Sequence, residues 1–115
     1  KALRDRSGIA RFAHAYAPLD EALARVVVDL PGRPFSSVTI PFVRESLGAI
    51  ATENITHFFQ SLATTARLTL HVDLIRGEND HHKAEACFKA LAIALRGAVA
   101  PDDSAGMPST KGTLA

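Results

Sequence analysis

Apolar residues change their spacing three times along this chain, and the order of these changes constrains the fold more than any other feature. Alternation with a period of two, which is typical of strands, occurs in four segments: residues 9–17, 22–30, 37–42 and 67–76. Apolar residues recur instead at intervals of three and four from about Thr52 and again from Asn79, which predicts two amphipathic helices. The order β-β-β-α-β-α predicts an α+β fold with two helices on one face of a mainly antiparallel sheet.

Prolines mark the expected ends of these elements. Pro18 is expected to end the first strand, and Pro101 to end the second helix. Pro41 falls inside the third strand segment, which indicates an edge strand or a bulge, because proline cannot donate a hydrogen bond to a neighbouring strand. Residues 101–115 have no periodicity and are expected to form a loop-like tail. At this length, residues 1–115 are expected to form a single domain.

The second helix is expected to begin at a polar cap, Asn79 or Asp80. Its buried stripe is expected to consist of Ala84, Cys87, Phe88, Leu91, Leu95 and Val99.

Composition argues against several functional classes. With 13 Lys and Arg against 12 Asp and Glu, and no basic run interleaved with aromatic residues, nucleic acid is not an expected partner. No apolar run reaches the length of a membrane span, so a membrane is not expected either. The single cysteine, Cys87, excludes an internal disulfide framework and fits a reducing compartment. Because the chain opens on Lys1 and not on Met, the natural amino terminus is expected to lie elsewhere.

The His-His-Lys-Ala-Glu sequence at residues 81–85 is the strongest indication of chemistry. In a helix, His81 lies four positions and His82 three positions from Glu85, so two imidazoles and a carboxylate crowd one end of the helix. His71, at the expected end of the preceding strand, is expected to lie close to them. These donors suit Mn, Fe, Zn or Ni, and the absence of thiolate donors disfavours structural zinc.

Adjacent histidines diverge by about 100° around a helix, so His81 and His82 are not expected to bind the same ion. Two neighbouring metals, or ligands shared across a subunit interface, follow more naturally. The alternative is a set of solvated polar residues at a helix start, where acidic side chains also suit the helix dipole. His14 and His57 stand alone and are expected to be ordinary surface residues.

Cations near this motif favour an anionic substrate such as a phosphate. Lys89 follows His82 by seven positions and shares its helical face. Arg11, Arg33 and the loop at 109–112 are further candidate donors. A solvated basic face is the alternative, and each of these residues taken alone is a weak indication.

Six stretches of the sequence together resemble imidazoleglycerol-phosphate dehydratase of histidine biosynthesis. They are Gly-Ile-Ala-Arg-Phe at 8–12, Pro-Leu-Asp-Glu-Ala-Leu at 18–23, Asp-Leu-Pro-Gly-Arg-Pro-Phe at 29–35, Leu-His-Val at 70–72, the run at 77–92, and Pro-Ser-Thr-Lys-Gly at 108–112. They follow the order of the family over nearly the whole chain.

The resemblance implies a duplicated fold. Members of this family contain two β-β-β-α-β-α halves, similar to the second domain of ribosomal protein S5, and this chain resembles the second half. The histidine motif of the first half and the amino-terminal glutamate that is thought to move protons have no counterpart in these residues. The isolated half is therefore expected to be inactive.

The resemblance also implies a reaction, in which a hydro-lyase dehydrates imidazole glycerol phosphate to imidazole acetol phosphate. The imidazole ring of the substrate must accept charge, which two Mn²⁺ ions per active site would stabilise as Lewis acids while they bind the ring as an imidazolate. The family's metal ligands match His71, His81, His82 and Glu85, and its phosphate-binding positions match Arg11, Arg33, Lys89, Ser109 and Lys111. Asp20 matches an active-site carboxylate whose role is left open.

The family resemblance further implies a homo-oligomer, a cubic 24-mer with intersubunit active sites. A cytoplasmic enzyme is expected, or a plastid enzyme if a transit peptide lies upstream. Two other functions stay open at this stage: a metal-binding or assembly half-domain without activity of its own, and a metallohydrolase.

Overall fold

The computed structural model describes residues 8–30 and 32–101. Its elements in chain order are β1 (Phe12–Leu19), β2 (Ala22–Asp29), β3 (Phe35–Thr39), β4 (Ser46–Leu47), β5 (Ile50–Ala51), α1 (Thr52–Ala66), β6 (Thr69–Arg76) and α2 (Asp80–Val99). The periodicity predicted all of these elements except the short β4–β5 hairpin.

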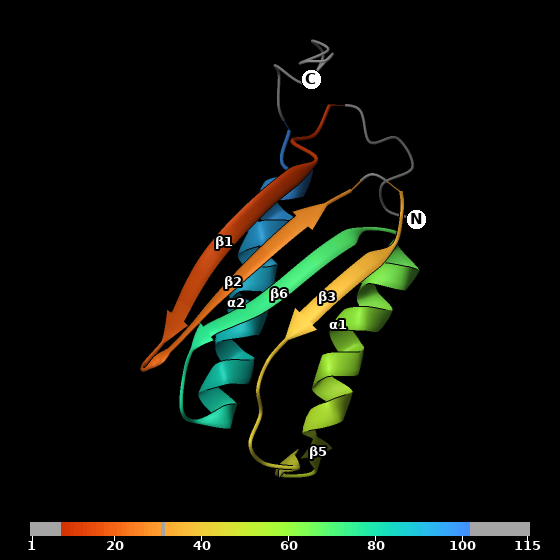
Figure 1. Ribbon diagram of the computed structural model, residues 1–115. Coiled ribbons are helices and arrows are strands. Elements are labelled where there is room, and N and C mark those ends of the chain that lie inside the picture. The colour runs from red at the N-terminus through yellow and green to blue at the C-terminus, as the bar shows by residue number, and fades with distance from the viewer. Residues whose placement is uncertain (1–7, 31, 102–115) are drawn as a thin grey trace.

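Four strands form one sheet in the order β1-β2-β6-β3. The pairs β1–β2 and β2–β6 are antiparallel, whereas β3 and β6 run parallel and are connected through α1. Both helices lie on the same face of this sheet (Figure 1). The predicted α+β fold, with two helices on a mainly antiparallel sheet, is confirmed. No helix in the described ranges has the length and apolar character that crossing a membrane requires.

The hydrophobic core lies between the sheet and the helices. Alternate residues of the central strands, including Val26, Val28, Leu70 and Val72, are fully buried on the helix side. Helix α1 contributes Phe59, which is also fully buried. The opposite side of the sheet, which we call the open face, carries the other alternate residues of each strand.

Helix α2 buries only part of the stripe expected: Ala84, Cys87 and Leu91 are buried as predicted. Its fully buried positions include Ala86, Ala90, Ala94 and Ala98, whereas Phe88 and Val99 remain 38% exposed. The expectation that these two larger residues line the buried stripe was wrong. Small side chains let α2 approach β1 and β2 closely, and they displace the larger residues to the edge of the contact.

Two strand boundaries also differ from expectation. Pro18 does not end β1, which continues to Leu19, because β1 is an edge strand and its outer side needs no backbone donor. Strand β3 ends at Thr39, before Pro41, and its edge position agrees with the prediction made from Pro41. Asn79 caps α2, because its side chain accepts a hydrogen bond from the backbone N–H of His82 at 3.0 Å.

The close contact of α2 with the sheet makes a stability prediction. Replacing Ala94→Leu is expected to lower the free energy of unfolding by about 1–3 kcal/mol, because the added carbons have no space against β1 and β2. Ala92→Leu, at an exposed position of the same helix, is the matched control and is expected to change stability little. Equal losses for both variants in chemical denaturation would contradict this packing.

Candidate metal and substrate site

His82 lies in the first turn of α2 and contacts the turn that joins β1 and β2. Its Nδ1 is 2.8 Å from Oε1 of Glu21, and its Nε2 is 3.5 Å from Oδ2 of Asp20. Asp20 adopts a left-handed backbone conformation with φ of 52°, which aspartate tolerates in tight turns. The hairpin therefore brings two carboxylates to one imidazole.

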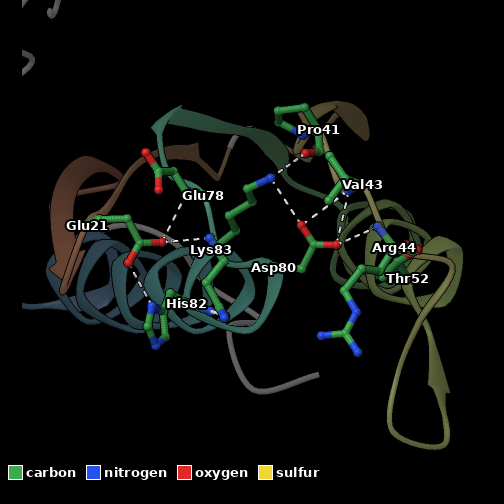
Figure 2. A network of polar contacts seen from close by, with 10 residues as sticks. Glu21, Pro41, Val43, Arg44, Thr52, Glu78, Asp80, His82 and Lys83 are labelled. Atoms are coloured by element: carbon green, nitrogen blue, oxygen red, sulfur yellow. Dashed lines mark hydrogen bonds and ion pairs between the residues drawn. The ribbon is translucent and has the colours of Figure 1, made fainter.

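Glu21 also holds the segment that precedes α2. Its Oε2 accepts hydrogen bonds from the backbone N–H groups of Glu78 at 3.0 Å and Asn79 at 2.7 Å (Figure 2). Three hydrogen bonds lower the pKa of Glu21 to about 2. The bond from the backbone of Asn79 has the largest effect, followed by those from His82 and from the backbone of Glu78. The hydrogen bond to Glu21 in turn raises the pKa of His82.

His81 points away from His82 and has a different carboxylate partner. Its Nε2 lies 3.2 Å from Oε2 of Glu85, and both side chains are exposed. His81 and Glu85 line one end of an otherwise largely apolar groove between α1 and α2, together with Phe58 and Phe88. The two adjacent histidines thus form two separate pairs with carboxylates, as their angular separation on a helix predicts.

The expectation that His71 lies close to the histidine pair was wrong. His71 is the third residue of β6, five positions before the strand ends at Arg76, which amounts to about 16 Å along the strand. Its neighbours Leu70 and Val72 point into the core, so His71 lies on the open face, where its ring packs 5.6 Å from that of Phe35. Within residues 8–30 and 32–101, no three His, Cys, Asp or Glu side chains gather as a metal site.

A buried ion pair at the start of α2 was not found by sequence reasoning. The side chain of Asp80 is fully buried, lies 3.1 Å from Nζ of Lys83, and accepts hydrogen bonds from the backbone N–H groups of Val43 and Arg44 (Figure 2). Lys83 also donates to the backbone carbonyl of Pro41 at 2.8 Å. Burial raises the pKa of Asp80, but the hydrogen bonds from Arg44, Lys83 and Val43 outweigh it and lower the pKa overall.

Gly77 packs closely against this ion pair. A Cβ at this position would lie 3.1 Å from the side chain of Lys83 and 3.2 Å from that of Ala22. In the sequence, the buried pair is indicated only by the spacing of Asp80 and Lys83, which are three residues apart at a helix start.

The cations predicted to bind phosphate are divided between the two ends of the sheet. Arg11 precedes β1 and lies near the carboxyl end of α2, whereas Arg33 precedes β3, where its carbonyl accepts a hydrogen bond from Oγ1 of Thr69. Lys89 lies nearer the histidine motif and donates to the carbonyl of Pro18 at 2.7 Å. Because β1 has 8 residues and rises about 3.3 Å per residue, its two ends, next to Arg11 and Asp20, are about 23 Å apart. Ser109 and Lys111 lie outside the described residues.

Arg11 has an unusual backbone. Its φ of 83° is in the region that favours glycine, its N–H donates to Ala98 of α2, and its carbonyl accepts from Leu30. Its side chain pairs with Asp29 at 3.1 Å while remaining 55% exposed. An arginine that keeps a strained backbone at an exposed position indicates a role for its guanidinium group.

A family model described as imidazoleglycerol-phosphate dehydratase matches residues 1–95. The chain belongs to the imidazoleglycerol-phosphate dehydratase family. This confirms the resemblance drawn from the sequence motifs. An imidazoleglycerol-phosphate dehydratase of Phytophthora nicotianae is 60% identical over 114 residues, which cover 99% of this chain and 25% of that protein. One of Candida glabrata is 55% identical over 115 residues, which cover 100% of this chain and 55% of that protein.

Solved structures of imidazoleglycerol-phosphate dehydratases have the same fold. The Staphylococcus aureus structure matches with a TM-score of 0.84 and 44% identity over 88% of this chain and 59% of that one. The Pyrococcus furiosus structure matches with a TM-score of 0.77 and 37% identity over 92% of this chain and 58% of that one. The chain thus spans between a quarter and somewhat over half of the length of these family members.

Two substitutions at Arg11 distinguish the effect of backbone strain on stability from the effect of losing the side chain. Arg11→Ala and Arg11→Gly both remove the ion pair with Asp29, but only glycine adopts a φ of 83° without strain. We expect the Gly variant to be more stable than the Ala variant by about 1 kcal/mol in denaturant unfolding. An Ala variant that equals or exceeds the Gly variant would contradict the backbone assignment.

The Glu21–His82 pair predicts a pH dependence of stability in metal-free protein. Glu21 has a lowered pKa, so its contribution is complete above pH 4.5 and is lost as the pH falls towards 2. His82 has a raised pKa, so its contribution is complete below pH 6.5 and is lost as the pH rises through the raised value. The destabilisation caused by Glu21→Gln is therefore expected to be largest between pH 4.5 and 6.5. Thermal unfolding across the pH range measures it, and a pH-independent difference would contradict the pairing.

Proposed function

We propose that this chain is the second half of a hydro-lyase that dehydrates imidazole glycerol phosphate to imidazole acetol phosphate, with two Mn²⁺ ions per active site. The observation that carries the proposal is the pair of adjacent histidines at the start of α2, each with its own carboxylate and each facing a different side. Family membership supports the same reaction, since the matched relatives are described as dehydratases of imidazoleglycerol phosphate.

The donor atoms fit a metal of this kind. His81 Nε2 and Glu85 Oε2 already lie 3.2 Å apart, so they would bind one ion with little movement. His82 would present its Nε2 to a second ion. Bound Mn²⁺ would supply Lewis acidity that stabilises negative charge on the substrate's imidazole ring.

The remaining roles follow from position. The ammonium group of Lys89, which lies about two helical turns from the histidines, would bind the substrate's phosphate. Arg11 and Arg33 would also bind phosphate, and His71 would act as a metal ligand, but all three lie far from the start of α2. These residues would act at sites completed by another half or another subunit. We therefore propose a homo-oligomer, a 24-mer by family resemblance, with active sites between subunits.

The chain alone would lack part of each site. The described residues bring together two donors at His81 and Glu85, and one imidazole with two carboxylates at His82, but no complete metal site. This favours an inactive half that binds metal weakly or helps assembly when it is separated from the rest of the enzyme.

Replacing His82→Ala in the full-length protein is expected to abolish turnover and to remove Mn²⁺ from one of the two sites. Dehydratase activity and Mn²⁺ content measure both effects. His57→Ala, on the exposed side of α1, is the control and is expected to retain both. Full activity of the His82→Ala variant would contradict the proposal.

The 115 residues alone are expected to give no product from imidazole glycerol phosphate, because the metal site is incomplete within residues 8–30 and 32–101. Product formation by this piece would show that it needs no other half. Phosphate-ester hydrolysis in place of dehydration by the full-length protein would instead favour a metallohydrolase.

A further inference from the structure

We infer that Glu21 is a positioning residue that decides which nitrogen of His82 is available to a metal. The inference rests on the proposed function, because it assigns a role toward the metal proposed there. It concerns a residue that is not among the expected ligands or phosphate-binding residues.

The geometry ties Glu21 to three partners at once. Its Oε2 accepts from the backbone N–H groups of Glu78 and Asn79, at 3.0 and 2.7 Å, and its Oε1 lies 2.8 Å from Nδ1 of His82. These partners are 57 to 61 positions away in the sequence. The backbone of the turn and the orientation of the imidazole are thus set by the same carboxylate (Figure 2).

Hydrogen-bond chemistry then determines the tautomer of neutral His82. An ionised carboxylate only accepts hydrogen bonds, so Nδ1 must carry the proton that it donates to Glu21. The lone pair of the ring is consequently on Nε2, the nitrogen that a metal would take. A carboxylate that holds the second nitrogen of a metal-bound histidine fixes the ring and increases its basicity.

A second carboxylate lies on the other side of the ring. Oδ2 of Asp20, the residue before Glu21, lies 3.5 Å from Nε2 of His82. Asp20 is also acceptor-only, and two electron-rich atoms that face one another attract a cation or a proton. Glu21 therefore places the free nitrogen of His82 beside a second potential oxygen donor.

The substitution Glu21→Gln tests whether Glu21 sets the tautomer of His82. The single carbonyl oxygen of glutamine is expected to take the two backbone donors, which have no other partner in this contact. Its NH₂ group would then face Nδ1, which must become the acceptor, and the ring proton would move to Nε2. Glu21→Gln is thus expected to keep the turn attached while it blocks the metal-binding nitrogen.

The experiment uses the full-length protein with Mn²⁺ as the probe. We expect Glu21→Gln to weaken Mn²⁺ binding at one site by about 10- to 100-fold in an EPR titration. Glu78→Gln makes the same charge change at a residue that Glu21 contacts only through the backbone N–H, and is the matched control. Binding by Glu21→Gln that equals that of the control overturns the inference.

A spectroscopic readout separates positioning from structural support. In metal-free wild-type protein, at a pH where His82 is neutral, ¹⁵N NMR of labelled histidine should show Nδ1 protonated and Nε2 unprotonated. The His82→Ala spectrum assigns the signals, and Glu21→Gln should reverse the pattern. A wild-type protein with the proton on Nε2 overturns the inference even if the variant fails to fold.

The outcomes also distinguish this inference from the proposed function. If His82→Ala leaves Mn²⁺ binding and turnover intact, the proposed function fails, and with it the role assigned to Glu21. If His82→Ala abolishes binding while Glu21→Gln does not weaken it, only the role of Glu21 fails.

Discussion

Two carboxylates hold the amino terminus of α2, and the candidate site depends on both. Glu21 binds the backbone just before the helix from the β1–β2 turn, and Asp80 in its first turn binds the backbone at Val43 and Arg44. Lys83 neutralises Asp80 inside the protein. A buried charge that loses its partner costs about 3–5 kcal/mol, so these segments are strongly bound to one another. The histidines follow directly after these two contacts, and the orientation of His82 depends on Glu21.

The same arrangement explains why the site is divided. The alanine-lined face of α2 lies along β1 and β2, so its two ends coincide with the two ends of the sheet. The histidines are at one end, and Arg11 and Arg33 are at the other. A rigid sheet cannot bend to bring these ends together. Within the described residues, the histidines and these arginines therefore do not meet at one site.

Periodicity predicted most of the fold because an element that is buried on one side has apolar residues at regular intervals in the sequence. The prediction failed where this pattern is short or ambiguous. The strands β4 and β5 have two residues each, too few to show a period. Pro18 is a poor guide to the end of β1 because an edge strand tolerates it. In α2, alanines count little in an apolar pattern, yet they are what packs against the sheet.

The sequence by itself determined the order of the elements, the family, and the presence of two imidazoles and a carboxylate in one turn of a helix, since these depend on local spacing and on motifs. The tertiary structure alone decided that His82 contacts Glu21 and Asp20, that Lys83 and Asp80 are buried, and that His71 lies far from the histidine pair. These facts depend on hairpin register and on contacts between distant segments, such as Glu21 and His82, which are 61 positions apart. No local pattern records such contacts, because they form only when the sheet and helices pack together.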